Sequence, residues 1–111
     1  MNKELIEKVS AIREYLTSLT QVTDVKKLAD LASQKNFDEM ERIYLEITPH
    51  MTVEQRSRAT WYFAPAIQAE IYLRTGKDFL TGTVTRLVPP LIADLDDLAE
   101  NLNKGNQGGR P

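Results

Sequence analysis

Apolar side chains recur along the chain with helical spacing, in segments separated by short polar or proline-containing breaks. The first segment, residues 2–19, has one apolar side chain every three or four positions and charged side chains between them. This narrow heptad stripe predicts an amphipathic helix. It favours one helix of an antiparallel bundle over the alternative, a coiled-coil dimer. The stripe consists of Leu5, Val9, Ile12, Leu16 and Leu19.

Two shorter helical segments follow the first one. The pattern predicts a helix over residues 24–34 and another over residues 36–47. Asn36 is the predicted N-cap of the second of these, because its side chain can accept a hydrogen bond from the first helical turn. The residue before Pro49 is disfavoured in the helical conformation, and the helix is therefore expected to end there.

A final apolar stripe extends over residues 84–102, but the proline pair at 89–90 interrupts it. Proline has no backbone N–H for the preceding helical turn. The final helix is therefore expected to start at Pro90 and to end at Gly105. Residues 105–111 are predicted to form a disordered C-terminal tail.

The most apolar segment lies in the middle of the chain. It predicts a helix from Val53 to Thr75, with Thr52 as its N-cap. Gly76 is expected to end this helix. Ten of the thirteen residues 61–73 are apolar or aromatic, so apolar side chains point in nearly every direction around the axis. A helix that is apolar on every side has to be surrounded by other elements.

Pro65 lies inside this central segment, where it is expected to bend the helix. The alternative is that Pro65 belongs to the first turn of a separate helix. The whole pattern predicts an all-α fold: a compact bundle of four to five helices around the central apolar helix, up-and-down or nearly so. A chain of 111 residues suits one domain, which is predicted to span residues 1–104.

Composition narrows the possible environments and partners. The chain has no cysteine and no apolar run long enough to cross a bilayer. Its N-terminus is charged. A cytoplasmic protein without a membrane segment is therefore expected. The net charge is −2, with five basic and three acidic residues between Val53 and Arg86, but four acidic and no basic residues between Pro90 and Glu100. This mild local basic excess disfavours nucleic acid as the main ligand.

No motif with a specific catalytic or ligand-binding spacing is present. His50 is the single histidine, and it is interpreted as a connector residue beside a proline rather than as a general base. The acidic residues at 94–100 lack the glycine and the alternating spacing of a calcium loop. They are interpreted as a solvated helix face or an acidic contact surface. No enzyme activity, catalytic residue, cofactor or metal is predicted.

Two segments resemble parts of tetratricopeptide repeats. Residues 28–47, which include Phe37 and Tyr44, resemble the second half of such a repeat, and residues 69–79 resemble the first helix and turn of another. The aromatic residues after the two turns, Phe37 and Phe79, are 42 positions apart (79 minus 37). The family repeats every 34 residues or so, and the chain is therefore not assigned to it.

The surplus of large side chains in the central helix suggests a partner. In a continuous helix Trp61 and Tyr72 point in the same direction as Arg58, and these residue types often anchor interfaces. Either the rest of the bundle covers this direction, or it binds another protein or a second copy of the chain. The predicted function is a small non-enzymatic interaction protein: an adaptor, an assembly factor, or a stoichiometric inhibitor or regulator. Its predicted binding residues are Trp61, Tyr72, Arg58, Arg74, Asp94, Asp96 and Asp97.

The alternative function is a helical subunit of a nucleoprotein complex that contacts the nucleic-acid backbone. Phosphate contacts require arginine or lysine, and binding through them weakens as salt rises. The candidate residues for this alternative are Arg56, Arg58, Arg74, Lys77 and Arg86.

Overall fold

The computed structural model describes residues 2–108, which form six α-helices and one short 3-10 turn, without any strand among them. The all-α fold and the compact bundle predicted from the sequence are confirmed. The elements, in chain order, are α1 (Asn2–Gln21), α2 (Val25–Leu31), α3 (Gln34–Ile47), η1 (Thr48–His50), α4 (Val53–Ala59), α5 (Ala64–Thr75) and α6 (Leu80–Gly108).

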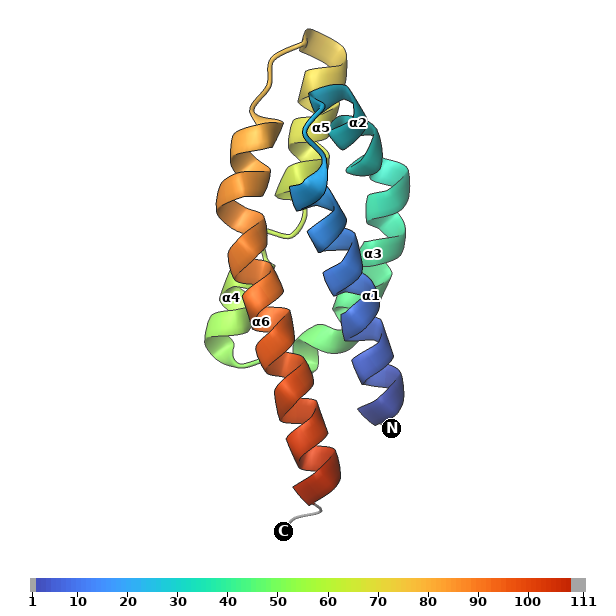
Figure 1. The fold of residues 1–111 in the computed structure, drawn as a ribbon, viewed down its shortest axis with the longest axis vertical. Helices are drawn as coiled ribbons and strands as arrows, with labels where there is room; N and C mark the ends of the chain where they lie inside the picture. Colours follow the sequence, from blue (N-terminus) through green and yellow to red (C-terminus); the bar gives the residue numbers. More distant parts are fainter. Residues whose placement is uncertain (1, 109–111) are drawn as a thin grey trace.

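The helices α1 and α6 form the most extensive contact of the molecule, and they run antiparallel (Figure 1). The heptad stripe of α1 packs on a matching stripe of α6, and an ion pair between Arg13 and Asp96 joins the two helices at the surface. The predicted stripe of α1 is therefore buried against a helix of the same chain. The buried residues of the seam are Val9, Ile12, Leu16, Leu19, Val84, Val88, Leu91, Leu95 and Leu98.

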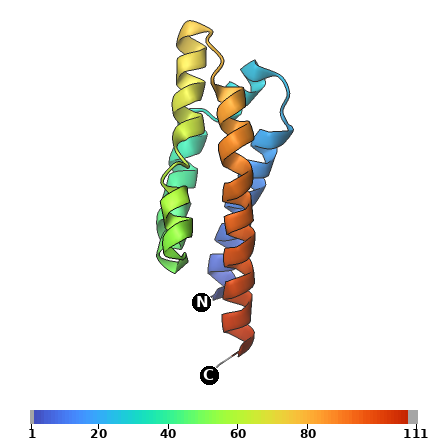
Figure 2. The ribbon, with the colours of Figure 1, turned by 90° about the vertical axis from the view of Figure 1, so that its left-hand side faces the viewer.

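The remaining helices lie along this pair. Figure 2 shows α4 and α5 one after the other along one side of α6, and both are in contact with it. The helix α3 packs on α1 and α5, and α2 packs on α5 and α6. The long helix α6 is thus the element that contacts most of the others, and it occupies the position that the sequence predicted for residues 53–75.

The predicted helix from Val53 to Thr75 is two helices, α4 and α5, joined by a turn at residues 60–63. The prediction of a kink at Pro65 is wrong, and the alternative of a first-turn proline is correct. Pro65 has no N–H to donate to the carbonyl of Trp61, and the N–H of Ala64 donates to it instead at 3.0 Å. The chain therefore tightens into a turn before α5 begins.

The two ends of the predicted helix are correct. Thr52 and Gln55 form a reciprocal capping box at the start of α4. Gly76 ends α5 with a φ of 77°, in the left-handed conformation that glycine adopts most easily. The prediction that this segment is surrounded is wrong for α5, because Ile67 and Leu73 are each 48% exposed.

The final helix starts ten residues earlier than predicted, at Leu80 instead of Pro90. Asp78 supplies the missing cap, since its carboxylate accepts hydrogen bonds from the backbone N–H and the hydroxyl of Thr81 at 2.9 and 2.7 Å. Pro89 and Pro90 lie inside the helix on its exposed side. The carbonyls that lose their donors there belong to exposed residues, so water can hydrogen-bond to them.

Two further predicted boundaries differ from the structure. Ser33, not Asn36, precedes α3, so Asn36 lies inside the helix. Helix α6 continues through Gly105 to Gly108, because Gly105 stays helical instead of turning left-handed as Gly76 does. The end of the predicted tail, residues 109–111, lies outside the described residues.

Candidate protein-interaction surface

Trp61 is the most prominent exposed aromatic residue of the turn between α4 and α5. Its side chain is 56% exposed, and the neighbouring Phe63 is 37% exposed. The two rings stack with centroids 6.3 Å apart and planes inclined by 23°. We call the surface around these rings the Trp61 surface. It comprises Arg58, Trp61, Phe63, Arg86, Leu87 and Pro90.

Two shallow pockets flank Trp61, where the turn lies against α6. One pocket, of about 290 Å³, is bounded by Trp61, Thr83, Arg86 and Leu87. The other, of about 100 Å³, is bounded by Trp61 and Leu87 together with Arg58, Pro90 and Leu91. Because Trp61 and Leu87 line both pockets, the indole separates two hollows of one continuous surface.

The ion pair between Arg58 and Asp94 holds α4 against α6 beside this surface. The guanidinium binds the carboxylate with two hydrogen bonds, of 2.7 Å from Nε and 2.8 Å from a terminal nitrogen. The side chain of Asp94 is only 8% exposed, whereas that of Arg58 is 50% exposed. The hydrogen bonds and the negative charge of Asp94 raise the pKa of Arg58 above its ordinary value. The pair therefore fixes the residues that precede Trp61.

Tyr62 anchors the turn from its other side. Its ring stacks on Tyr44 and Phe37 with centroid distances of 4.6 and 5.4 Å. Its hydroxyl donates to a carboxylate oxygen of Glu41 at 3.0 Å. Burial, with a smaller effect of Glu41, raises the pKa of Tyr62 to about 12. With Tyr62 packed on α3, the side chains of Trp61 and Phe63 are left exposed.

The acidic residues predicted as one contact surface are engaged in different places. Asp94 pairs with Arg58 of α4, Asp96 pairs with Arg13 of α1, and Asp97 is exposed. Successive residues of a helix are turned by about 100°, so positions 94, 96 and 97 point in different directions. Only Asp97 of the three is left without a strong intramolecular partner among the described residues.

Tyr72 and Arg74 do not belong to the Trp61 surface. Tyr72 is partly buried and packs against the core. Arg74 is exposed and pairs with Glu70 on α5 at 2.8 Å. The turn at residues 60–63 breaks the regular helical rotation, so Trp61 and Tyr72 no longer share the direction that a continuous helix would give them.

The cations considered for nucleic-acid binding are spread over the molecule. Arg56 lines a pocket with Tyr62, and Arg74 lines one with Ile67. These two pockets share no residue with those beside Trp61. Lys77 lies in the connection between α5 and α6. Of the five candidate cations, Arg58 and Arg86 are brought together at the Trp61 surface.

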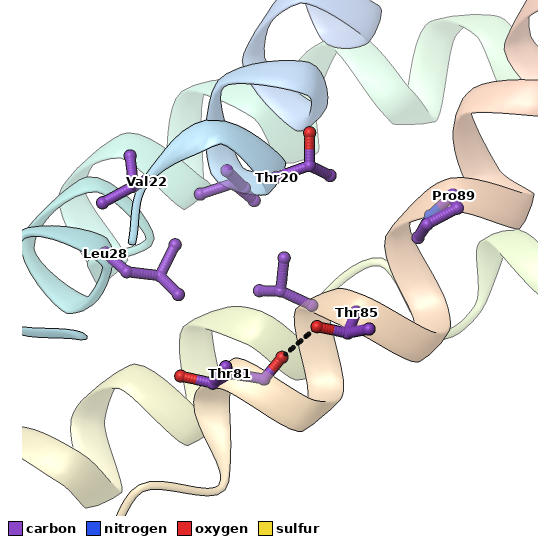
Figure 3. A pocket seen from close by; sticks show the side chains of 8 residues that line it. Thr20, Val22, Leu28, Thr81, Thr85 and Pro89 are labelled. Atoms are coloured by element: carbon purple, nitrogen blue, oxygen red, sulfur yellow. Dashed lines mark hydrogen bonds between the residues drawn. The ribbon is translucent and has the colours of Figure 1, made fainter. Parts of the chain in front are cut away.

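A further pocket, of about 190 Å³, lies between the end of α1, the start of α2 and the first half of α6 (Figure 3). Its polar side chains are Thr20, Thr81 and Thr85, and each hydroxyl donates to a neighbouring group of the chain. The lining contains no titratable side chain for acid–base chemistry. The rest of the lining is Leu19, Val22, Leu28, Val84 and Pro89.

Residues 2–108 contain neither a metal-binding cluster nor a membrane-spanning helix. No group of three or more histidine, cysteine, aspartate or glutamate residues there is arranged to hold a metal ion. None of the helices in this range combines the length and the apolar content needed to cross a membrane. His50 is exposed at the end of η1.

No protein-family model, curated protein or solved structure matches the chain. The surface of the molecule is therefore the basis for proposing a function. The feature that stands out on that surface is the pair of stacked, exposed rings with two arginines beside it.

The sequence indicated part of this surface. It marked Trp61 and Arg58 through residue type, but it missed Phe63, Leu87 and Pro90 as their neighbours. Leu87 and Pro90 come from α6, and contact between α6 and the 60–63 turn depends on tertiary packing.

Proposed function

We propose that this chain is a small non-enzymatic protein that binds another protein through the Trp61 surface. It would act as an adaptor, an assembly factor or a stoichiometric regulator of that partner. The observation that carries the proposal is the exposure of Trp61, stacked on Phe63 and flanked by Arg58 and Arg86. Tryptophan and arginine are enriched among the residues that dominate binding energy at protein interfaces.

The way in which the surface is held also supports binding. The Arg58–Asp94 pair and the stacking of Tyr62 fix both sides of the turn that presents Trp61. A rigid surface loses little conformational entropy when a partner binds. We therefore propose that the partner meets a largely pre-formed site.

The test is affinity capture from the lysate of the native cell, with and without nuclease, using tagged wild type and two variants. Trp61→Ala removes the exposed ring, and Leu45→Ala removes a side chain on α3 that is slightly more accessible, with 64% exposure. We expect Leu45→Ala to retain the captured proteins and Trp61→Ala to lose them, with a tenfold or greater loss of affinity, because central aromatic anchors are worth about 2 kcal/mol or more. Helical circular dichroism is expected to be the same for all three proteins.

Two results would contradict the proposal. Capture of the same proteins by Trp61→Ala as by wild type would exclude the Trp61 surface as the binding site. Capture that disappears with nuclease would instead favour the nucleoprotein alternative and the arginines as its contacts.

A further inference from the structure

We infer that the partner docks on the Trp61 surface as an amphipathic helix, which presents a carboxylate to Arg86 next to a large apolar side chain. This inference rests on the proposed function and specifies the chemistry of the partner. Its basis is the charge of Arg86, which is unpaired within residues 2–108, and the helical spacing of the α6 residues that line the two pockets beside Trp61.

Among the described residues, Arg86 is the charged side chain of the Trp61 surface that is left without an acidic partner. The two pockets beside Trp61 are lined by Arg58 and Arg86 and by no acidic side chain. The charge of Arg58 is already balanced by Asp94. Arg86 has no carboxylate partner within the described part of the chain, and its guanidinium makes a long hydrogen bond of 3.4 Å to the carbonyl of Gly82. A complementary partner would supply the missing carboxylate at this point.

The apolar residues of the Trp61 surface determine which kind of partner side chain lies beside that carboxylate. Arg86 and Leu87 line the larger pocket together with Trp61. Leu87 is partly buried and Trp61 is 56% exposed, so an inserted apolar side chain would cover both. Burial of such a group stabilises a complex roughly in proportion to the apolar area removed from water.

The shape of the surface favours a helix as the docking element. The residues that α6 contributes are Thr83, Arg86, Leu87, Pro90 and Leu91, which follow one another at helical spacing in a row about 12 Å long. Such a row matches side chains at positions i, i+3, i+4 and i+7 of a second helix. Addition of a strand would need an exposed sheet edge, and residues 2–108 contain no sheet.

The test uses a phage-displayed library of amphipathic helices of about 18 residues, which is five turns. The library is selected on the full-length protein and counter-selected on Trp61→Ala. We expect the selected helices to carry aspartate or glutamate within one turn of a large apolar residue. We also expect Arg86→Glu to lower their affinity about tenfold or more, because it places like charges together.

A charge reversal on the helix completes the test. Lysine in place of the selected carboxylate should restore binding to Arg86→Glu and weaken binding to wild type. Arg42→Glu is the matched control, since Arg42 is exposed on α3 and lines neither pocket. We expect this control variant to bind the selected helices with wild-type affinity.

The outcomes separate this inference from the proposed function. Selected helices that need Trp61 but show no acidic preference would overturn the inference and leave the proposed function in place. If counter-selection on Trp61→Ala removes every helix that binds the wild type, both are overturned. A labelled single-stranded oligonucleotide that binds through Trp61 and Arg86, with affinity that falls steeply with salt, would also overturn both.

Discussion

The contact between Arg58 and Asp94 links the stability of the protein to the position of its exposed tryptophan. Asp94 is buried, so the loss of Arg58 would leave its carboxylate without two charge-assisted hydrogen bonds. We expect Arg58→Ala to lower the urea midpoint more in the wild-type background than in an Asp94→Ala background, where no buried carboxylate remains. Urea unfolding of the four proteins of this double-mutant cycle, followed by circular dichroism, measures the difference.

The matched control is the pair formed by Lys26 and Asp30, which are four residues apart on α2 and both exposed. Exposed pairs of this kind contribute little, because water and salt screen them. Their cycle is therefore expected to show a much smaller coupling. Equal coupling in the two cycles would mean that the burial of Asp94 does not strengthen its ion pair.

At the scale of single residues, the sequence indicated which side chains were unusual but not where they lie. Trp61 was singled out through its type, and its exposure shows that the rest of the bundle does not cover it. Asp94 was grouped with its acidic neighbours, because a pattern of charges does not show which of them faces an arginine 36 positions earlier. That information depends on how α4 packs on α6.

At the scale of elements, the continuity of α6 through its prolines can be tested by substitution. Pro89→Ala restores an N–H that can donate to the carbonyl of Thr85, and Pro89 is exposed. Proline inside a helix costs about 3 kcal/mol, and the added flexibility of the unfolded chain offsets up to about 1 kcal/mol. We therefore expect Pro89→Ala to stabilise the protein by about 2–3 kcal/mol in urea unfolding.

Pro65→Ala is the control for this prediction. Pro65 lies in the first turn of α5, where its missing N–H would have no helical partner. Its replacement is expected to leave the stability unchanged or to lower it. If Pro89→Ala also failed to stabilise the protein, the carbonyl of Thr85 would not be in position to accept a helical hydrogen bond.

The sequence predicted well those helix ends that depend on a few neighbouring residues. The capping box at Thr52 and the left-handed Gly76 depend on a few neighbouring residues, and both were predicted correctly. The split between α4 and α5 was missed, because the apolar pattern continues through it. The start of α6 was missed because the proline pair at 89–90 was expected to interrupt the helix, whereas Asp78 caps the helix before Thr81.

At the scale of the whole molecule, the choice of neighbours is what the sequence left open. Helices α1 and α6 come from opposite ends of the chain and form its largest contact. Their stripes have the same spacing, so the pattern allowed α1 to pack within the chain or on a second copy. The structure pairs α1 with α6, and both helices lie along the longest axis of the molecule, which extends over 54 Å (Figure 1).

Because one core cluster draws on all six α-helices, the molecule should unfold as one cooperative unit. Leu95 lies fully buried in the seam. Leu95→Ala is expected to cost about 2–5 kcal/mol, a large part of the roughly 5–15 kcal/mol that stabilises a typical domain. Urea unfolding followed by far-UV and by tyrosine near-UV circular dichroism should show one shared, lowered midpoint.

Leu45→Ala, on the exposed side of α3, should stay within about 0.5 kcal/mol of wild type. Separate midpoints in Leu95→Ala would instead mean that the α1–α6 pair and the other helices are stabilised independently.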